Sequence, residues 1–502
     1  MKRFLKSSIA FVLALAMVVP SVSANAATFE RASIYSNTDA AEVTTPSPYG
    51  HLNVVGKEST GIVEEASLSM ASLDGASLPS KYDPRKQKLG YKLPAIRDQG
   101  NFGTCWAHAA LGALEISAIK NSKVKDSINL SEVQLVSGAY YHPGKDPIGY
   151  LGKDNYSMSI FISKPEMGGT TDLAVNAMVN RAVGLEEKKS STLKYTATNM
   201  NKYAFKKLSS KLAYGANAVN IQNYVELKSP TVTDIKKAIM KYGAVKVSYY
   251  ANYPGCTNMK TGAIYNPVNR GTNHDVILVG WDDKYSKSNF TTKPSKNGAW
   301  IMRNSWGTSV ADKGYFYLSY YDKTACEFTF IEGVNASKDN YKRTYQCDSM
   351  PYNDYFTGNF PLANMFTAKA AEKLGAVSFE CKAKKGEKYV VEIYTGCSTG
   401  KPKSGKKVAT LKGTYSYTSD NMNMYVKLKS PVTLKKNQKF SIVVTTSGSS
   451  RVKIDTDDTI NFGVAHLYKK PENSKKYSYA VEGSYAEASP YDVCIKAYTK
   501  KK

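Results

Sequence analysis

The stretch Gln99–Ala107 constrains the fold of this 502-residue chain more than any other part of its sequence. It is a turn-forming segment with two glycines, Gly100 and Gly103, and it runs directly into Cys105. From Cys105 to Lys120 the residues are mostly helix-forming and apolar, without proline, so the sequence predicts a helix that begins at the cysteine. The first turn of a helix offers unpaired backbone N–H groups and a positive dipole end, and both stabilise a thiolate. The pattern favours a nucleophilic cysteine; a buried cysteine with only a packing role is the alternative.

Two later stretches supply the groups that a thiol nucleophile needs. Asn273–Trp281 carries a histidine, His274, at the head of an apolar strand pattern. Ala299–Thr308 is a second apolar strand pattern, and it ends in Asn-Ser-Trp-Gly beginning at Asn304. The thiol needs an imidazole to take and return its proton, and the imidazole needs a third group to fix its ring. We therefore expect these three stretches to meet in one site.

Taken together, these stretches resemble the papain-like cysteine peptidases, whose Gln…Cys-Trp, His and Asn-Ser-Trp-Gly blocks occur in this order. The resemblance covers about residues 78–322. It includes Leu78–Arg85, which is similar to a mature start, the helix start Leu130–Val136, and the glycine pair Gly168-Gly169. Within the helix start, Ser131 and Gln134 have capping-box spacing. The resemblance implies an α+β papain-like two-lobe fold, with a helical lobe and a β lobe.

The resemblance also implies a role for each matching residue. Cys105 is the nucleophile, His274 the general base and acid, and Asn304 the residue that orients the histidine. Gln99 and the Cys105 N–H stabilise the oxyanion, Gly168 and Gly169 bind the peptide backbone, and Trp306 covers the Asn304–His274 hydrogen bond. No cofactor is implied.

His108 is an alternative base, because it lies three residues from Cys105 on the predicted helix and such a pair can touch. The family places an apolar residue at this position and uses the histidine on the strand. We therefore interpret His108 as a packed histidine.

The chain departs from the family pattern in its cysteines. Phe102 and Gly138 stand where many members have cysteine, so the usual disulfides of the catalytic domain are not expected. Six cysteines remain besides Cys105, and their spacing selects none of the 15 full pairings; they are Cys256, Cys326, Cys347, Cys381, Cys397 and Cys494. Export permits disulfides, and free thiols are equally open.

Between the motifs, the sequence predicts a helix over Asp172–Arg181 and a second helix over Thr231–Tyr242. The second helix has Thr233 as its expected N-cap and Gly243 at its end. Residues 184–230 are interpreted as a connector without a site signal. Strands are expected at Ala244–Tyr250, Val276–Trp281, Ala299–Arg303 and Tyr315–Tyr320, and residues 285–298 read as a surface loop.

The N-terminus has the pattern of an exported protein. Residues 1–26 are predicted to be a signal peptide, with a basic start, an apolar run and a small-residue cleavage site at Ala24–Ala26. Residues 27–77 are a propeptide or a linker, and the resemblance favours a propeptide that lies in the active-site cleft. No later segment has the length and apolarity to span a membrane.

Past the peptidase domain, predicted at 78–332, short strands alternate with turn clusters. Residues 338–499 are therefore predicted to form a β-sandwich, and they resemble the lectin-like domain of bacterial surface cysteine peptidases. Such a domain binds a carbohydrate or wall polymer, or only supports the peptidase; the sequence leaves this open. Asp455, Asp457 and Asp458 are either calcium ligands or a solvated loop.

The formal net charge of +26 indicates affinity for polyanions, and export makes an anionic wall polymer a better candidate than nucleic acid. No nucleic-acid-binding motif is present. The sequence thus predicts a secreted or wall-associated cysteine endopeptidase acting on bacterial surface or envelope proteins. The alternatives are a catalytically silent adhesin on a papain scaffold, and an exopeptidase or transpeptidase that uses the same acyl-enzyme.

Overall fold

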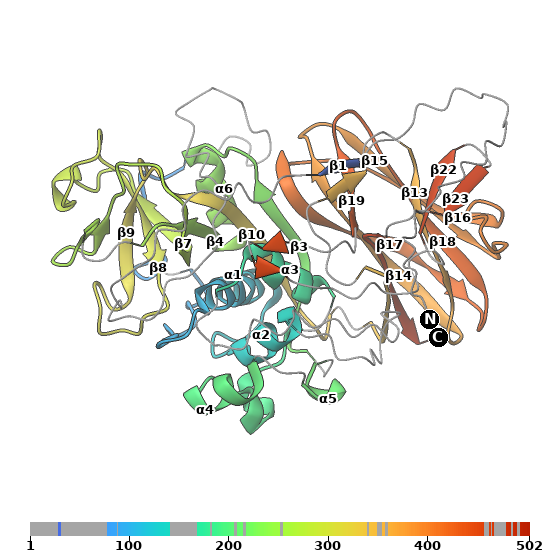
Figure 1. Ribbon diagram of the computed structural model, residues 1–502, viewed down its shortest axis with the longest axis horizontal. Helices are drawn as coiled ribbons and strands as arrows, with labels where there is room; N and C mark the ends of the chain where they lie inside the picture. The colour runs from blue at the N-terminus through green and yellow to red at the C-terminus, as the bar shows by residue number, and fades with distance from the viewer. Residues whose placement is uncertain are drawn as a thin grey trace, which may run out of the picture.

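A computed structural model describes residues 29–31, 78–87, 89–140, 168–180, 183–204, 208–213, 217–251, 255–338, 341–348, 354–356, 360–455, 461–462, 464–465, 478–482, 485–488 and 492–501. The predicted signal peptide and residues 32–77 lie outside these ranges. Figure 1 shows a β-rich part at the left, helices at the centre and below, and the C-terminal strands at the right. The α+β two-lobe fold followed by an all-β domain is confirmed.

Helix α1 (Cys105–Ser122) runs through the middle of the protein and begins at the predicted cysteine. Sixteen of its 18 residues are buried, so the helix has no solvent face and its apolar composition is explained by packing on all sides. It ends two residues later than expected, where Lys123 adopts a left-handed φ of 55°. The smaller helices of this lobe are α2 (Glu132–Tyr140), α3 (Thr171–Val179), α4 (Ala197–Asn199) and α5 (Ser210–Ala213), with η1 (Glu187–Lys189), η2 (Ser191–Leu193) and η3 (Met200–Ala204).

Two predicted helix caps need correction. Helix α6 (Val232–Tyr242) is capped by Thr231, not Thr233: the Thr231 hydroxyl accepts from Asp234 N, and the Asp234 carboxylate accepts from Thr231 N. This reciprocal pair requires an acidic residue three positions after the cap. Asp234 stands three positions after Thr231, whereas Lys236 stands three positions after Thr233. At α2 only half of the predicted box forms, because Gln134 N donates to Ser131 Oγ while the Gln134 side chain accepts from Gly184 N and Leu185 N.

The β lobe is an antiparallel sheet in the order β10–β4–β7–β8–β9, built mainly from the predicted strand segments. The register shifts in β10 between Cys326 and Thr329, and Glu327 there has a positive φ of 51°. This irregularity turns the Glu327 side chain toward the sheet interior, as described below. The strands are β2 (Lys81–Tyr82), β4 (Val245–Tyr249), β5 (Thr257–Asn258), β6 (Ala263–Ile264), β7 (His274–Asp282), β8 (Ala299–Arg303), β9 (Tyr315–Ser319) and β10 (Cys326–Asn335), with η4 (Lys287–Asn289) in the predicted surface loop.

The C-terminal part contains two packed sheets. One has the order β16–β15–β18–β13–β22–β23, and the other includes β11–β25–β14–β17. Apolar residues of both sheets, such as Phe440 and Phe379, belong to one buried cluster, as expected for a β-sandwich. The strands are β11 (Arg343–Tyr345), β12 (Asp354–Phe356), β13 (Leu362–Thr367), β14 (Glu372–Ala383), β15 (Lys388–Thr395), β16 (Lys406–Thr414), β17 (Ser419–Leu434), β18 (Lys439–Thr446), β19 (Arg451–Asp455), β20 (Asn461–Phe462), β21 (Val464–Ala465), β22 (Ser478–Glu482), β23 (Tyr485–Ala488), β24 (Asp492–Val493) and β25 (Ile495–Lys501).

Strand β3 (Val219–Leu227) joins the two parts, and it lies inside the segment that the sequence indicated to be a plain connector. It pairs with β10 of the peptidase part on one edge and with β17 of the C-terminal part on the other. One hydrogen-bonded sheet therefore continues from the β lobe into the sandwich. The connector interpretation is wrong for these nine residues.

Three further features concern the N-terminal segment, the thiols and the helices. Strand β1 (Phe29–Arg31), inside the predicted propeptide or linker, pairs antiparallel with β12 of the C-terminal part. The seven cysteines, all of them among the described residues, form no disulfide with one another. Within the described ranges, no helix is both long and apolar enough to cross a membrane.

Candidate active site

The loop that leads into Cys105 is held in place by backbone hydrogen bonds and by Tyr195. Phe102 N donates to Gln99 O (3.3 Å), and Thr104 N donates to Phe102 O (2.8 Å). The Tyr195 hydroxyl donates to Gln99 O (2.8 Å) and lies 2.6 Å from Thr104 Oγ1. Thr104 therefore uses its hydroxyl on Tyr195 and does not cap α1 with it. Sequence reasoning missed Tyr195, because it lies in a polar segment more than ninety positions from the loop that it contacts.

His274 and Asn304 lie side by side, as the sequence predicted. His274 is the first residue of β7 and Asn304 follows the last residue of β8, and these two strands pair. His274 Nε2 lies 2.9 Å from Asn304 Oδ1, so this nitrogen is the donor because an amide oxygen only accepts. The Trp306 ring stacks on the imidazole at a centroid distance of 4.7 Å and an angle of 22°. The Asn304 oxygen also accepts from Ser305 N (2.7 Å), which fixes the amide orientation.

Gln99 connects the cysteine loop to the strand that carries Asn304. Its backbone N donates to Ser305 O (2.8 Å), and its side-chain Oε1 accepts from Ser305 Oγ (2.8 Å). Its Nε2 donates to Phe102 O (2.9 Å), which uses one of the two amide hydrogens. The second hydrogen is available to a ligand beside the N-terminus of α1.

The site is buried. Cys105 is 1% exposed, His274 0% and Asn304 3%. Burial, followed by the charge of Asp275, raises the pKa of the Cys105 thiol to about 12, although a backbone hydrogen bond from Asp275 and the charge of Lys246 oppose this shift. Burial lowers the pKa of His274 to about 4 against the hydrogen bond to Asn304. In this closed arrangement the cysteine is a thiol and the histidine a neutral imidazole at neutral pH.

The glycine pair lies against the tryptophan that follows the cysteine. A Cβ on Gly169 would come within 2.3 Å of the Trp106 indole, so a side chain at this position is excluded. Trp106 is itself buried in α1, and its Nε1 donates to Gly103 O (3.1 Å). The segment from Gly168 into α3 therefore passes directly over the start of α1.

A buried charge cluster that the sequence did not predict contains Asp275, the residue after His274. Lys246 of β4 is fully buried, and its Nζ lies 3.0 Å from Asp275 Oδ1 and 3.1 Å from Glu327 Oε2. It also donates to Ser248 Oγ (2.5 Å) and to Thr171 Oγ1 at the start of α3. Burial raises the pKa of Asp275 against the charge of Lys246. We call Thr171, Lys246, Ser248, Asp275 and Glu327 the Lys246 cluster.

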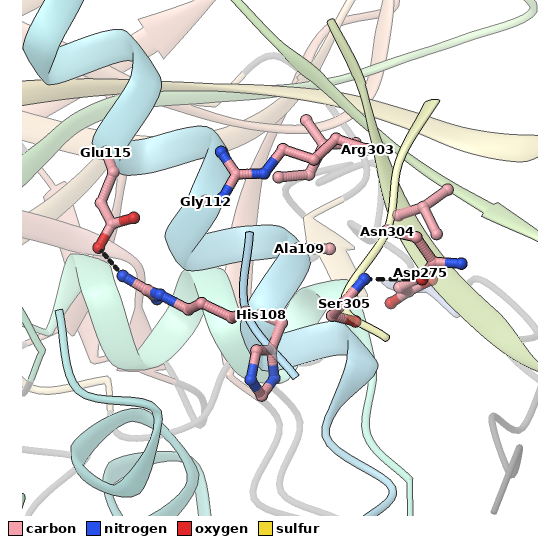
Figure 2. A pocket seen from close by; sticks show the side chains of 11 residues that line it. His108, Ala109, Gly112, Glu115, Asp275, Arg303, Asn304 and Ser305 are labelled. Atoms are coloured by element: carbon pink, nitrogen blue, oxygen red, sulfur yellow. Dashed lines mark hydrogen bonds and ion pairs between the residues drawn. The ribbon is translucent and has the colours of Figure 1, made fainter. Parts of the chain in front are cut away.

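His108 is a packed histidine, as predicted, and it lines a small cavity together with Asn304. Its Nδ1 lies 2.9 Å from Thr104 O, its Nε2 lies 3.7 Å from Glu132 Oε1, and its ring packs edge-on against Tyr195. Figure 2 shows His108 and Glu115 of α1 on one side of a small cavity, with Asn304 and Ser305 on the other. The cavity, about 20 Å³, has the size of one water molecule and is too small for a substrate.

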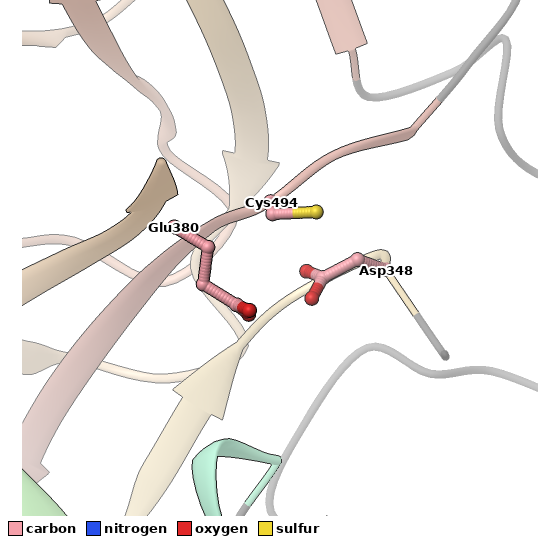
Figure 3. Close-up of side chains that lie close together, drawn as sticks. All are labelled: Asp348, Glu380 and Cys494. Atoms are coloured by element: carbon pink, nitrogen blue, oxygen red, sulfur yellow. The ribbon is translucent and has the colours of Figure 1, made fainter. Parts of the chain in front are cut away.

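A second buried cluster, in the C-terminal part, contains metal-ligand types. Asp348, Glu380 and Cys494 place their ligand atoms within 4.8 Å of one another (Figure 3). Two buried lysines already neutralise the carboxylates: Lys453 Nζ lies 3.4 Å from Glu380, and Lys496 contacts Asp348 directly. A cation would have to displace a lysine, so these residues do not fit a metal site. Asp457 and Asp458 of the calcium prediction lie outside the described residues.

Comparison with known proteins agrees with this geometry. The sequence profile of the papain family cysteine proteases matches residues 78–332, and that of the lectin-like domain matches residues 344–499. Cathepsin K of Mus musculus is 28% identical over 254 residues, which are 50% of this chain and 63% of cathepsin K. A viral cathepsin of Adoxophyes honmai nucleopolyhedrovirus is 29% identical over 243 residues, 48% of this chain and 56% of the relative. The chain thus spans less than two thirds of the length of these relatives.

Two solved structures match both parts of the chain. The cysteine protease and lectin-like domains of Cwp84, a surface layer associated protein of Clostridium difficile, superpose with a TM-score of 0.67 and 26% identity over 91% of this chain and 94% of theirs. The same clostridial protease after propeptide cleavage gives a TM-score of 0.66 and 27% identity over 84% of this chain and 100% of its own. Because the papain-family profile matches half of the chain, including the cysteine, histidine and asparagine stretches, the chain belongs to the papain family of cysteine proteases and carries a lectin-like domain after its protease domain.

Proposed function

We propose that this papain-family protease is a secreted cysteine endopeptidase in which Cys105 is the nucleophile and His274 the general base and acid. The observation that carries this proposal is the His274–Asn304 hydrogen bond of 2.9 Å beneath the Trp306 ring. It uses Nε2 and leaves Nδ1 without a partner among the described residues, so that Nδ1 is the nitrogen free to exchange a proton with a thiol. Asn304 orients the ring, as a neutral amide can.

The proposed reaction proceeds through a thioester. The Cys105 sulfur attacks the peptide carbonyl, His274 takes the thiol proton and returns it to the leaving amine, and water then hydrolyses the thioester. The second hydrogen of Gln99 Nε2 and the N–H of Cys105 stabilise the oxyanion. Gly168 and Gly169 bind the substrate backbone, because glycine has no side chain that would keep the substrate backbone away from the backbone of the protein.

The burial of the site supports a closed precursor. A thiol with a pKa near 12 is a poor nucleophile at neutral pH, and exposure of the site to water removes the main cause of that shift. We propose that residues 1–26 are the signal peptide, that residues 27–77 are a propeptide whose removal opens the site, and that the protease domain 78–332 and the lectin-like domain 338–499 form the mature enzyme.

The proposed substrates are bacterial surface or envelope proteins. Support comes from the likeness to Cwp84, a surface layer associated protein of Clostridium difficile, and from the net charge of +26, which favours anionic wall polymers. We propose that the lectin-like domain binds a carbohydrate or such a polymer. A salt-releasable fraction of the protein on cells supports this placement, and exclusive recovery from the free medium contradicts it.

Labelling of the thiol tests the peptidase proposal most directly. The chain beginning at Leu78 is treated with an epoxide that alkylates activated thiols, and the modified residue is identified by mass spectrometry. We expect one adduct, at Cys105, which disappears in Cys105→Ala and slows at least a hundredfold in His274→Ala. The chain with residues 27–77 retained should react more slowly. If the chain from Leu78 is folded yet unlabelled, the protein is not a peptidase, and the adhesin alternative takes its place.

A further inference from the structure

The segment Gly168–Asp172, which precedes and begins α3, contacts two parts of the protease that carry the catalytic groups. On one side, Gly169 lies against the Trp106 indole, next to Cys105 in α1. On the other side, Thr171 Oγ1 donates to Glu327 Oε2 (3.0 Å) and contacts Lys246, which in turn binds Asp275. Asp275 is the residue after His274. This segment therefore contacts the residue that follows the nucleophile and, through Lys246, the residue that follows the histidine.

The same segment has a third contact, with the lectin-like domain. Asp172 Oδ1 accepts a hydrogen bond from Asn421 Nδ2 at 3.0 Å. Asn421 belongs to β17 and is 1% exposed. A hydrogen bond from a buried amide to a carboxylate is charge-assisted and holds both side chains to one geometry.

Asn421 is itself held firmly. Its Oδ1 lies 2.9 Å from the Tyr224 hydroxyl, which also lies 2.8 Å from Glu380 Oε2, and Glu380 belongs to the lysine-neutralised cluster of the lectin-like domain. Strand β17 pairs directly with β3, where Asn421 faces Glu226, after a register shift that follows Ser419. The backbone that carries Asn421 is thus part of the sheet that continues between the two parts, which is a rigid mount.

We propose that the lectin-like domain is a working part of the protease site, because Asn421 positions Asp172 and so holds the segment Gly168–Asp172 over Trp106. Asn421 is a positioning residue and touches no substrate. The proposal deepens the proposed function, since it rests on Gly168 and Gly169 binding the substrate backbone. It gives the C-terminal domain a role in peptide binding that does not depend on any carbohydrate.

The expected consequence is a specific loss of substrate binding. When Asn421 loses its amide, the glycine pair samples positions that do not align with a bound peptide, while the His274–Asn304 hydrogen bond is kept. In the protein comprising residues 78–502, we expect Asn421→Ala to raise KM for a fluorogenic peptide amide about tenfold and to change kcat less than about threefold.

Asn423 provides a matched control on the same strand. It is equally buried, and its Nδ2 donates to Gln222 O (2.6 Å) of β3, so Asn423→Ala weakens the same junction without touching α3. Both variants should lose similar thermal stability, but only Asn421→Ala should raise KM. A double-mutant cycle with Asp172→Ala should be strongly non-additive in KM, and Asp172→Asn, which keeps an oxygen acceptor, should restore most of the binding.

The outcomes separate this proposal from the peptidase proposal. If the parent protein labels at Cys105 and cleaves the peptide, but Asn421→Ala and Asn423→Ala have the same KM, or if the Asp172 cycle is additive, the positioning role is refuted. If the folded parent protein neither labels nor cleaves, the peptidase proposal has failed instead.

Discussion

Two of the buried charge clusters among the described residues, one in each domain, differ in their balance. In the lectin-like domain, two carboxylates, Asp348 and Glu380, face two lysines, and all four are buried. In the protease domain, the single Lys246 faces two carboxylates and completes its contacts with hydroxyls. A balanced buried cluster needs no further proton or ligand, whereas an unbalanced one remains sensitive to its surroundings. The unbalanced cluster lies one residue from His274, and this contrast suggests that the first cluster supports the fold and the second one the chemistry.

The largest effect is expected from Lys246→Met. The change leaves two buried carboxylates without their cation, which should cost about 3–5 kcal/mol of unfolding free energy. It also removes a charge that lowers the pKa of Cys105, so epoxide labelling per folded molecule should slow about tenfold. Denaturant unfolding and labelling rates check both parts. An unchanged labelling rate would mean that the Lys246 cluster only stabilises the fold.

Lys496→Met is the corresponding change in the balanced cluster. Asp348 and Glu380 then share only Lys453, and the loss of stability should again be about 3–5 kcal/mol. Labelling of Cys105, corrected for the folded fraction, should stay within about twofold of the parent, since this lysine is not among the groups that act on the thiol. A tenfold slowing would show that both clusters act on the chemistry.

A smaller effect is expected from two tyrosine hydroxyls, one in each domain. Tyr195→Phe removes the hydrogen bond to Gln99 O and the contact with Thr104, which should cost about 1 kcal/mol and, by loosening the oxyanion loop, lower kcat/KM about fivefold. Tyr345→Phe removes a buried hydrogen bond to Glu372 in the lectin-like domain at a similar cost in stability. Its kcat/KM should not change. Equal kinetic effects in the two variants would contradict a local role for Tyr195.

The sequence predicted those site residues whose surroundings are local. Cys105 follows a glycine-containing turn, and His274 and Asn304 stand at the ends of apolar strands, so each is marked by its own neighbours. Lys246 was missed because a lysine in a strand is ordinarily taken as exposed, and its partners come from three distant segments. Glu327 reaches the cluster only through a register shift that no local pattern announces.

Strand β3 was missed for a different reason. Val219–Leu227 alternates apolar and polar residues over its first half, which is a strand signal, but the surrounding segment is rich in Lys, Asn and Tyr, which favours a connector. Two of its residues, Tyr224 and Asn223, bind residues of the lectin-like domain. In a sequence, polar residues that form hydrogen bonds between two domains cannot be distinguished from polar residues that face water.

The smallest expected effect concerns the stability of the protein in acid. It distinguishes the protease domain from the lectin-like domain, because both described histidines, His108 and His274, belong to the protease domain. Burial lowers the pKa of His108 against the charge of Glu132, with Arg97 and Asp98 also facing the ring. Below pH 6.5 the unfolded chain therefore binds more protons than the folded one, and stability falls as the pH falls.

His108→Phe removes this titration. Between pH 7.5 and pH 5.5 the variant should lose less thermal stability than the parent, by about 1 kcal/mol or roughly 2–4 °C. His108→Gln is the control, because it keeps a polar side chain but cannot titrate. Both variants should show the same reduced dependence of stability on pH, whatever their absolute melting temperatures. The loss of the titratable imidazole is the change that the two variants share. If Gln follows the parent and only Phe differs, the effect comes from packing against Tyr195, and the acid sensitivity of the protease domain must then be assigned to His274.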